Sequence, residues 1–167
     1  MEWQAFLPGI IGSFVGVMGW LAVGIYIQRR QFKRQARNAA KAVYFELDVN
    51  RSTLDVAREH GLFSTLDRSS FERLLPELAT LLHAGELRTV VEAYKTHAGF
   101  RQLASREDLP EQVRRAALGT YADVHERAIG ALRSRAFTRQ EARALDASGQ
   151  ATSAEPRIKD GMARLKS

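Results

Sequence analysis

The chain has 167 residues and a mass of 18.7 kDa, which suits one domain with a short extension. Hydrophobic residues make up 45% and charged residues 26% of the sequence, a balance that is typical of globular proteins and excludes a disordered chain. The absence of Cys excludes disulfide scaffolds, thiolate metal sites and cysteine nucleophiles. The net charge of +6 is local, because residues 28–41 contain six Lys or Arg and no acid.

The first element in the chain is an uncharged segment over residues 6–27, preceded by the short stretch 1–5. A helix over its 22 residues rises about 33 Å, enough for the ~30 Å hydrocarbon core of a bilayer. A cleaved secretory signal fits less well, because no Lys or Arg precedes the apolar run. The segment therefore predicts a single-pass transmembrane helix.

A basic segment follows directly, and it sets the expected orientation. The positive-inside rule predicts an external N-terminus over 1–5, a C-terminal domain in the cytoplasm, and a location in the cytoplasmic (inner) membrane. Contact with anionic lipid head groups is a second expected role. Nucleic acid is not expected as a partner, because the segment holds a single aromatic residue and the rest of the chain is neutral. The basic residues are Arg29, Arg30, Lys33, Arg34, Arg37 and Lys41.

Small residues recur in the apolar segment at helical spacing, at Gly9, Gly12, Gly16 and Gly19. They fall in one stripe, and a Gly-x-x-x-Gly pair lets helix backbones approach closely in a membrane. The stripe predicts packing against other transmembrane helices, from copies of the chain or from a different protein. The alternative is that glycine is simply common in such helices.

Residues 28–60 predict a basic exit that continues as a stalk helix, because no Gly or Pro occurs between Gly24 and Gly61. Apolar or small residues recur there in a seam close to a heptad repeat, with Asn50 on the seam. A polar residue in that position often sets the register of a coiled coil. The alternative is that this face packs on the helices that follow.

Residues 61–147 predict a small antiparallel helical bundle, and no window shows the period-two alternation of a strand. Ser69 with Glu72 and Thr138 with Glu141 have capping-box spacing, while Gly85 suits a helix C-cap. Pro76 predicts a kink or a restarted helix. Residues 148–167 mix Ser, Gly, Pro and charge and predict a flexible tail. The expected fold class is all-α.

No motif in the chain carries recognisable chemistry. The glycines do not form a phosphate-binding loop, and no nucleophile elbow occurs. The four His are at least 14 residues apart, and none has the helical Glu or His spacing of a bundle metal site. None has the upstream Arg, four to six residues earlier, that marks some small all-α ribonucleases. No catalytic residue, metal or cofactor is therefore expected, and an enzyme whose residues converge only in the fold remains an alternative.

Three stretches resemble a set of uncharacterised small single-pass membrane proteins of high-GC bacteria: the QRR-x-x-x-R exit, AVYFELDVNRSTL, and FERLLPELATLL with LRTVVEAY. They cover about half of the chain and carry no diagnostic motif. The resemblance implies the same architecture, a membrane helix followed by a helical part, and it implies no activity.

These features favour a non-enzymatic, membrane-anchored helical module that acts as an accessory or scaffolding subunit of a membrane protein complex, with an unidentified cytoplasmic protein as partner. The alternative is a homo-oligomeric membrane effector or pore former of the phage-defence or toxin type. The span lacks a polar stripe that would line a lumen, apart from Ser13, which weighs against a pore.

Overall fold

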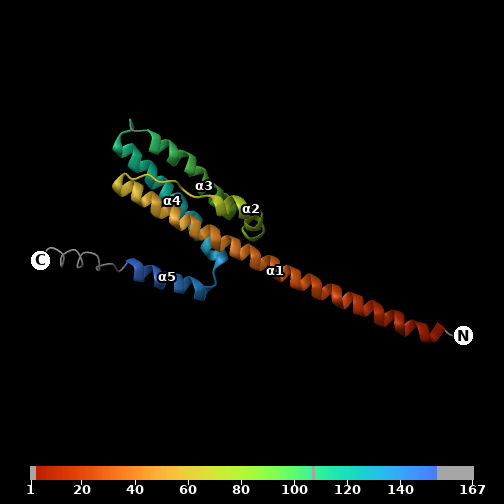
Figure 1. The fold of residues 1–167 in the computed structure, drawn as a ribbon. Helices are drawn as coiled ribbons and strands as arrows, with labels where there is room; N and C mark the ends of the chain where they lie inside the picture. The colour runs from red at the N-terminus through yellow and green to blue at the C-terminus, as the bar shows by residue number, and fades with distance from the viewer. Residues whose placement is uncertain (1–2, 107, 154–167) are drawn as a thin grey trace.

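The computed structural model describes residues 3–106 and 108–153, and it describes side chains over 16–106 and 108–147. The described residues form five helices and no strand, which confirms the all-α fold class (Figure 1). The helices are α1 Trp3–His60, α2 Ser69–Leu81, α3 Ala84–Ser105, α4 Glu111–Ala136 and α5 Arg139–Ser153.

Helix α1 is continuous over 58 residues, and it ends where the sequence predicts. Gly61 adopts a φ of 68°, and its N–H donates to the Ala57 carbonyl, so the helix ends in a left-handed glycine. The C-terminal half of α1 lies beside α3 and α4, while the N-terminal half projects alone from this body (Figure 1).

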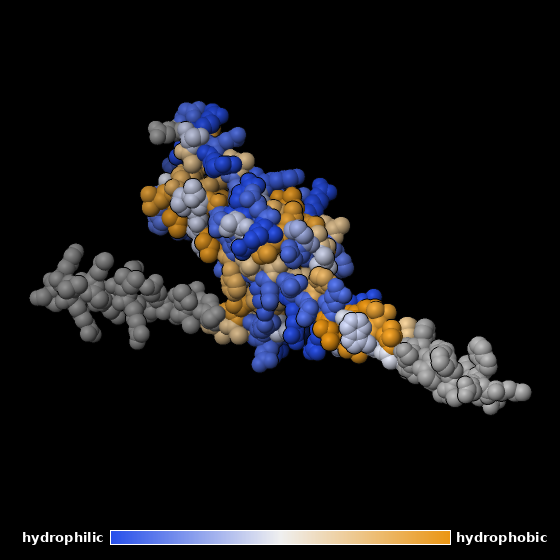
Figure 2. All heavy atoms as spheres, turned by 45° about the vertical axis from the view of Figure 1, so that its right-hand side comes forward, coloured by the Kyte–Doolittle hydropathy of each residue, from blue (hydrophilic) through white to orange (hydrophobic). Residues whose placement is uncertain are grey.

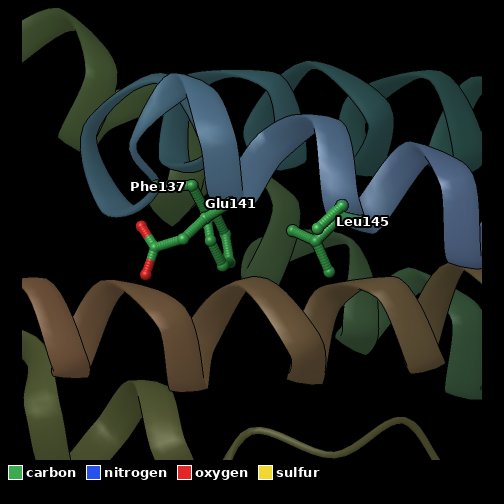
Figure 3. A pocket seen from close by; sticks show the side chains of 4 residues that line it. Phe137, Glu141 and Leu145 are labelled. Carbon is green, nitrogen blue, oxygen red and sulfur yellow. The ribbon is translucent and has the colours of Figure 1, made fainter.

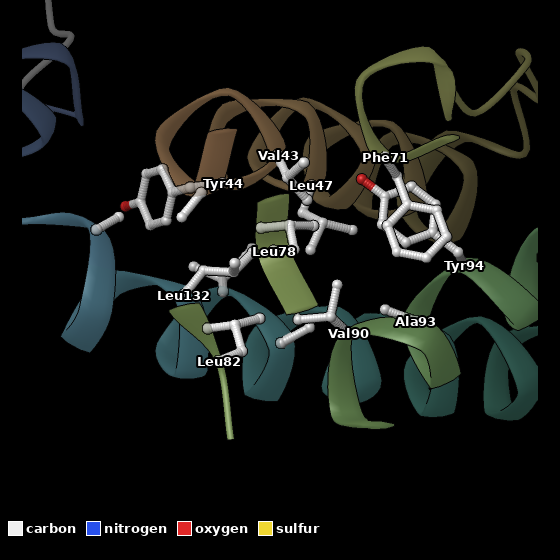
Figure 4. Close-up of a cluster of buried hydrophobic side chains, with 14 residues drawn as sticks. Val43, Tyr44, Leu47, Phe71, Leu78, Leu82, Val90, Ala93, Tyr94 and Leu132 are labelled. Carbon is white, nitrogen blue, oxygen red and sulfur yellow. The ribbon is translucent and has the colours of Figure 1, made fainter. Parts of the chain in front are cut away.

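The body encloses two adjoining hydrophobic clusters along the buried face of α1. The first joins α1, α2, α3 and α4 around Val43, Leu47, Leu78, Val90 and Leu132 (Figure 4). The second lies at the far end of α1, around Leu54, Phe100 and Leu118. The predicted heptad seam is therefore the face that packs on the chain's own later helices.

The prediction of a membrane span is contradicted. Among the described residues, no helix holds a stretch both long enough and apolar enough to cross a membrane. This finding corrects the predicted transmembrane helix over 6–27 and the inner-membrane location with an external N-terminus and a cytoplasmic C-terminal domain. The side chains of 6–15, with Gly9 and Gly12, lie outside the described residues.

Two local predictions, at Ser69 and at Gly85, differ from the structure. The Ser69–Glu72 capping box is absent, because Asp67 and Glu46 supply the acceptors at the start of α2. Gly85 is no C-cap: it lies in the first turn of α3, and the break falls at Leu82, which extends into the core. Pro76 lies inside α2, so the helix does not restart there, and the kink stays a prediction.

The last helix agrees with the sequence at its start and differs at its end. The Thr138 hydroxyl accepts from the Glu141 N–H, and the Glu141 carboxylate accepts from the Thr138 N–H, so this capping box is confirmed. Helix α5 continues to Ser153, beyond the predicted stop at Gly149. The rest of the predicted tail, 154–167, lies outside the described residues.

Candidate functional site

The projecting part of α1 exposes an apolar segment that none of the described residues covers. Every residue from 16 to 35 is exposed. Eight large apolar side chains between positions 17 and 27 are 44% to 79% exposed, with Trp20 the most exposed. They form the hydrophobic end of the described surface (Figure 2). They are Val17, Met18, Trp20, Leu21, Val23, Ile25, Tyr26 and Ile27, named here the apolar segment.

These side chains surround the helix axis and do not form a stripe. At about 100° per residue, positions 17, 20, 23 and 26 alone advance by about 300° at each step, and the others fill the directions between them. A helix that is apolar all round is normally enclosed by other apolar surfaces. The apolar segment is therefore as hydrophobic as a buried helix, although its side chains are exposed.

The predicted glycine stripe can be followed over part of its length. A Cβ at Gly16, Gly19 or Gly24 would meet no described atom within 4 Å beyond the helix itself. No contact within the described chain thus requires glycine at these positions, which leaves them open to the close approach of another helix. Helix packing through the stripe stays a prediction.

The basic residues after the apolar segment divide into two groups. Arg29, Arg30, Lys33, Arg34 and Arg37 are exposed, and none forms an ion pair with another described residue. Lys41 belongs to the body: its ammonium donates to Glu141 at 2.6 Å, and it lies 5.3 Å from the Phe137 ring centre. The Lys41 and Thr138 bonds lower the pKa of Glu141 to about 2. Five of the six predicted contact residues are therefore free to meet an anionic partner.

Glu46 is the centre of a buried polar network that sequence reasoning missed. Its carboxylate, on α1, accepts from the Ser70 N–H at 2.6 Å, the Phe71 N–H at 3.2 Å and the Tyr94 hydroxyl at 2.5 Å. It thus caps α2 from a different helix and satisfies donors that would otherwise be orphaned. Phe71 stacks on Tyr94 with ring centres 4.1 Å apart (Figure 4). Burial, followed by the bond to Glu46, raises the pKa of Tyr94 far above its ordinary value, so this hydroxyl is a fixed donor.

Asn50 lies one helical turn further along, and it fixes the loop 61–68. Its side-chain amide donates to the Asp67 carbonyl at 2.6 Å, and its carbonyl accepts from the Asp67 N–H at 2.8 Å. The structure thus places this buried polar residue against its own chain, which is the second of the two arrangements that the sequence left open. That Asn50 also sets the register of a coiled coil between copies stays a prediction.

His97 and His125 meet between α3 and α4, with their Nε2 atoms 3.4 Å apart and their ring planes 7° apart. His125 Nδ1 lies 2.9 Å from the Tyr121 carbonyl, which only accepts, so Nδ1 carries the proton. His125 Nε2 is then an acceptor, and His97 donates to it through Nε2. His97 Nδ1 is left as a buried acceptor that bonds to no described group. Burial, followed by the nearby His125, lowers the pKa of His97 to about 4, and burial also lowers the pKa of His125.

Glu46, Tyr94, His97 and His125 are buried. Two hollows on the described surface lie elsewhere: one is lined by Phe137, Glu141, Ala144 and Leu145 (Figure 3), the other by Gln35, Asn38, Ala39, Leu74 and Glu77. Among the described residues, no group of three or more His, Asp or Glu is placed to hold a metal ion. The Glu46 carboxylate bonds to the start of α2 and to Tyr94 of α3, and so joins three helices.

Comparisons with protein-family models, with curated proteins and with solved structures find no match to this chain.

Proposed function

We propose that this chain is a non-enzymatic helical interaction module, an accessory or scaffolding subunit whose projecting helix binds other helices. The observation that carries the proposal is the apolar segment, which is exposed on all sides and held away from the body. Large exposed apolar patches mark interaction surfaces.

Covering the apolar segment would contribute free energy of the same order as the cost of association. Full burial of a large apolar side chain contributes roughly 1.5–3 kcal/mol, so covering eight side chains that are about half exposed contributes roughly 8 kcal/mol. Association must offset a cost of roughly 4–15 kcal/mol in lost motion and ordering. The cost of ordering is reduced here, because the apolar segment is already helical as a continuation of α1.

The adjoining cations support the same proposal and describe the partner's chemistry. Five basic residues without a described counter-ion follow the apolar segment within two to ten positions of Ile27. A complementary partner presents apolar side chains next to carboxylates. The non-enzymatic part of the proposal is supported by the saturated hydrogen bonding of the buried polar network around Glu46.

Native mass spectrometry of the tagged full-length chain, isolated from the cells that produce it, tests this proposal. The expected result is a complex of defined stoichiometry that Leu21→Glu with Ile25→Glu abolishes. Glu retains high helix propensity, so this double variant changes the surface and leaves the helix intact. Leu62→Glu is the matched control, because Leu62 is 66% exposed and lies in the loop 61–68, far along the chain from the segment.

Two results would overturn the proposal. The first is a chain that is monomeric at 18.7 kDa both in cells and in purified form. The second is flotation of the purified chain with vesicles of phosphatidylglycerol and phosphatidylethanolamine while it binds no polypeptide.

A further inference from the structure

The body carries a second uncovered apolar surface, on the side of α1 that faces away from the core. Phe45, Val49 and Val56 are 47%, 64% and 43% exposed. They are separated by four and seven residues, so they lie on one face of α1. The buried residues Leu47 and Leu54 lie on the opposite face. The three exposed residues are named here the outer stripe.

Helix α5 lies beside the outer stripe. Phe45 packs edge-on against Phe137 with ring centres 6.1 Å apart. Glu141 and Leu145 of α5, together with Phe137 just after α4, point toward α1 and line a hollow there (Figure 3). An elongated apolar object lying on the outer stripe would therefore contact two helices, which suits a segment that is apolar all round.

Carboxylates accompany the outer stripe. Asp48, Asp55 and Glu59 recur at helical spacing along α1, on a row next to the stripe. Asp48 forms no ion pair with another described residue, Asp55 pairs with Arg51 and Arg58, and Glu59 pairs with Arg58 at 3.9 Å. The negative charge of this row is complementary to the positive charge of the basic residues that follow the apolar segment. Apart from Lys41, those basic residues form no ion pair with another described residue.

The apolar segment and the outer stripe have similar lengths. The apolar segment, from 17 to 27, rises about 15 Å, and the outer stripe, from 45 to 56, rises about 17 Å. A parallel alignment that lays 17–27 of one copy on 45–56 of another shifts the copies by about 28 residues, or about 42 Å. The body along α4 is about 39 Å long, so the two bodies clear each other end to end. In this register Arg29 and Arg30 lie beside Asp55 and Glu59 of the next copy.

The antiparallel alignment fails on charge. In that alignment residues 17–27 of each copy would lie on residues 56–45 of the other. The two α1 helices would cross at their midpoint near residue 36. The basic residues of 29–41 would then face the same residues of the other copy, and like charges in register repel.

We propose that the partner of the apolar segment is a second copy of this chain, which receives the segment in parallel between its outer stripe and α5. This inference rests on the proposed function and names the occupant of the same surface. Each copy offers one segment and one stripe, so the contact is heterologous, and it leads to open-ended head-to-tail assembly.

A complementation experiment with the full-length chain tests the proposal. The segment variant is Leu21→Glu with Ile25→Glu, and the stripe variant is Val49→Glu with Val56→Glu; all four positions are exposed, so the core is unchanged. Sedimentation velocity in lipid-free buffer measures the mass. The expected results are concentration-dependent growth of the wild type and of the Leu62→Glu control, and monomers for each variant alone. An equimolar mixture of the two variants gives one species of about twice 18.7 kDa, because one intact contact remains and cannot propagate.

Salt and charge reversal provide an independent readout. The structure predicts at least a threefold loss of affinity when 50 mM salt is raised to 300 mM, and a similar loss for Glu59→Lys, because Glu59 lies beside Arg30 of the next copy in this register. A mixture that stays monomeric overturns the proposal, as does a wild type that stops at a dimer strengthened by salt. A monomeric wild type that forms a complex with another polypeptide in cells overturns self-assembly and leaves the interaction module standing. A monomer in both settings overturns both.

Discussion

Replacing Glu46 by Ala tests whether one carboxylate joins α1, α2 and α3. The change leaves the Ser70 N–H, the Phe71 N–H and the Tyr94 hydroxyl without their acceptor. Each buried donor left unsatisfied costs roughly 1–3 kcal/mol, and water reaches the first of the three most easily because Ser70 is only partly buried. The expected loss is about 3–5 kcal/mol of unfolding free energy, a large share of a typical domain's stability.

The assay is urea unfolding at pH 7, followed by far-ultraviolet circular dichroism, with wild type and variants compared at equal m-values. Tyr94→Phe removes one donor and is expected to cost about 1 kcal/mol. Because the two residues share a bond, the double variant Glu46→Ala with Tyr94→Phe loses less than the summed single losses, by about 1 kcal/mol. Glu92→Ala, which removes an exposed pair with Arg88, is the control and costs under about 0.5 kcal/mol. A loss below about 1 kcal/mol for Glu46→Ala would refute the capping role.

Three further predictions concern the body. His97 has a folded-state pKa of about 4 against 6.5 in the unfolded chain, so the unfolded state binds more protons and stability falls as pH drops from about 6.5 to about 4. The fall attributable to this residue is about 3 kcal/mol, and His97→Leu is expected to flatten the stability profile measured by urea unfolding over that range. Asn50→Ala frees two backbone groups of the loop 61–68 and is expected to speed amide hydrogen exchange there, with a loss of about 2 kcal/mol. Gly99→Ala would place a Cβ against the Tyr121 hydroxyl and 2.9 Å from the ring carbon that bears it, and we expect a loss of about 1–2 kcal/mol in urea.

Each of these predictions has a control in the chain. Leu62→Ala, at an exposed position without a titratable group, leaves the pH profile unchanged. Asn38→Ala, exposed on the same helix, leaves exchange in the loop unchanged. Gly119→Ala meets open space and raises stability by up to about 1 kcal/mol. The reasoning fails if a variant and its control behave alike.

The single long helix was predictable because its signals are local. No breaker occurs between Gly24 and Gly61, and the end falls at a glycine in the left-handed region. The capping box at Thr138 was predictable for the same reason, since both partners are three residues apart. Such features require no knowledge of what packs against them.

The start of α2 was not predictable from local spacing. Its acceptor, Glu46, is 24 residues away from Ser70 and on another helix, so the Ser69–Glu72 spacing was a misleading signal. Leu82 extends into the core and ends α2 before Gly85. In both cases a tertiary contact overrode the local preference.

The histidine pair was missed because its members are 28 residues apart. A signal was present in α4: Leu118, Ala122, His125, Ile129 and Leu132 recur at alternating spacings of four and three, and all are buried. That series places His125 on the inner face of α4. The matching position on α3 requires the fold.

The central claim is that the apolar segment is buried when the protein works, and Trp20 reports on it directly. The chain has two Trp, so Trp3→Phe leaves Trp20 as the single emitter. In lipid-free buffer, its emission is expected to shift to shorter wavelength as concentration rises, and acrylamide quenching is expected to fall at least threefold. Leu21→Glu with Ile25→Glu in the same background is expected to abolish both changes. Emission and quenching typical of a water-exposed Trp at every concentration, both for the purified chain and for the chain in the complex isolated from cells, would contradict the account.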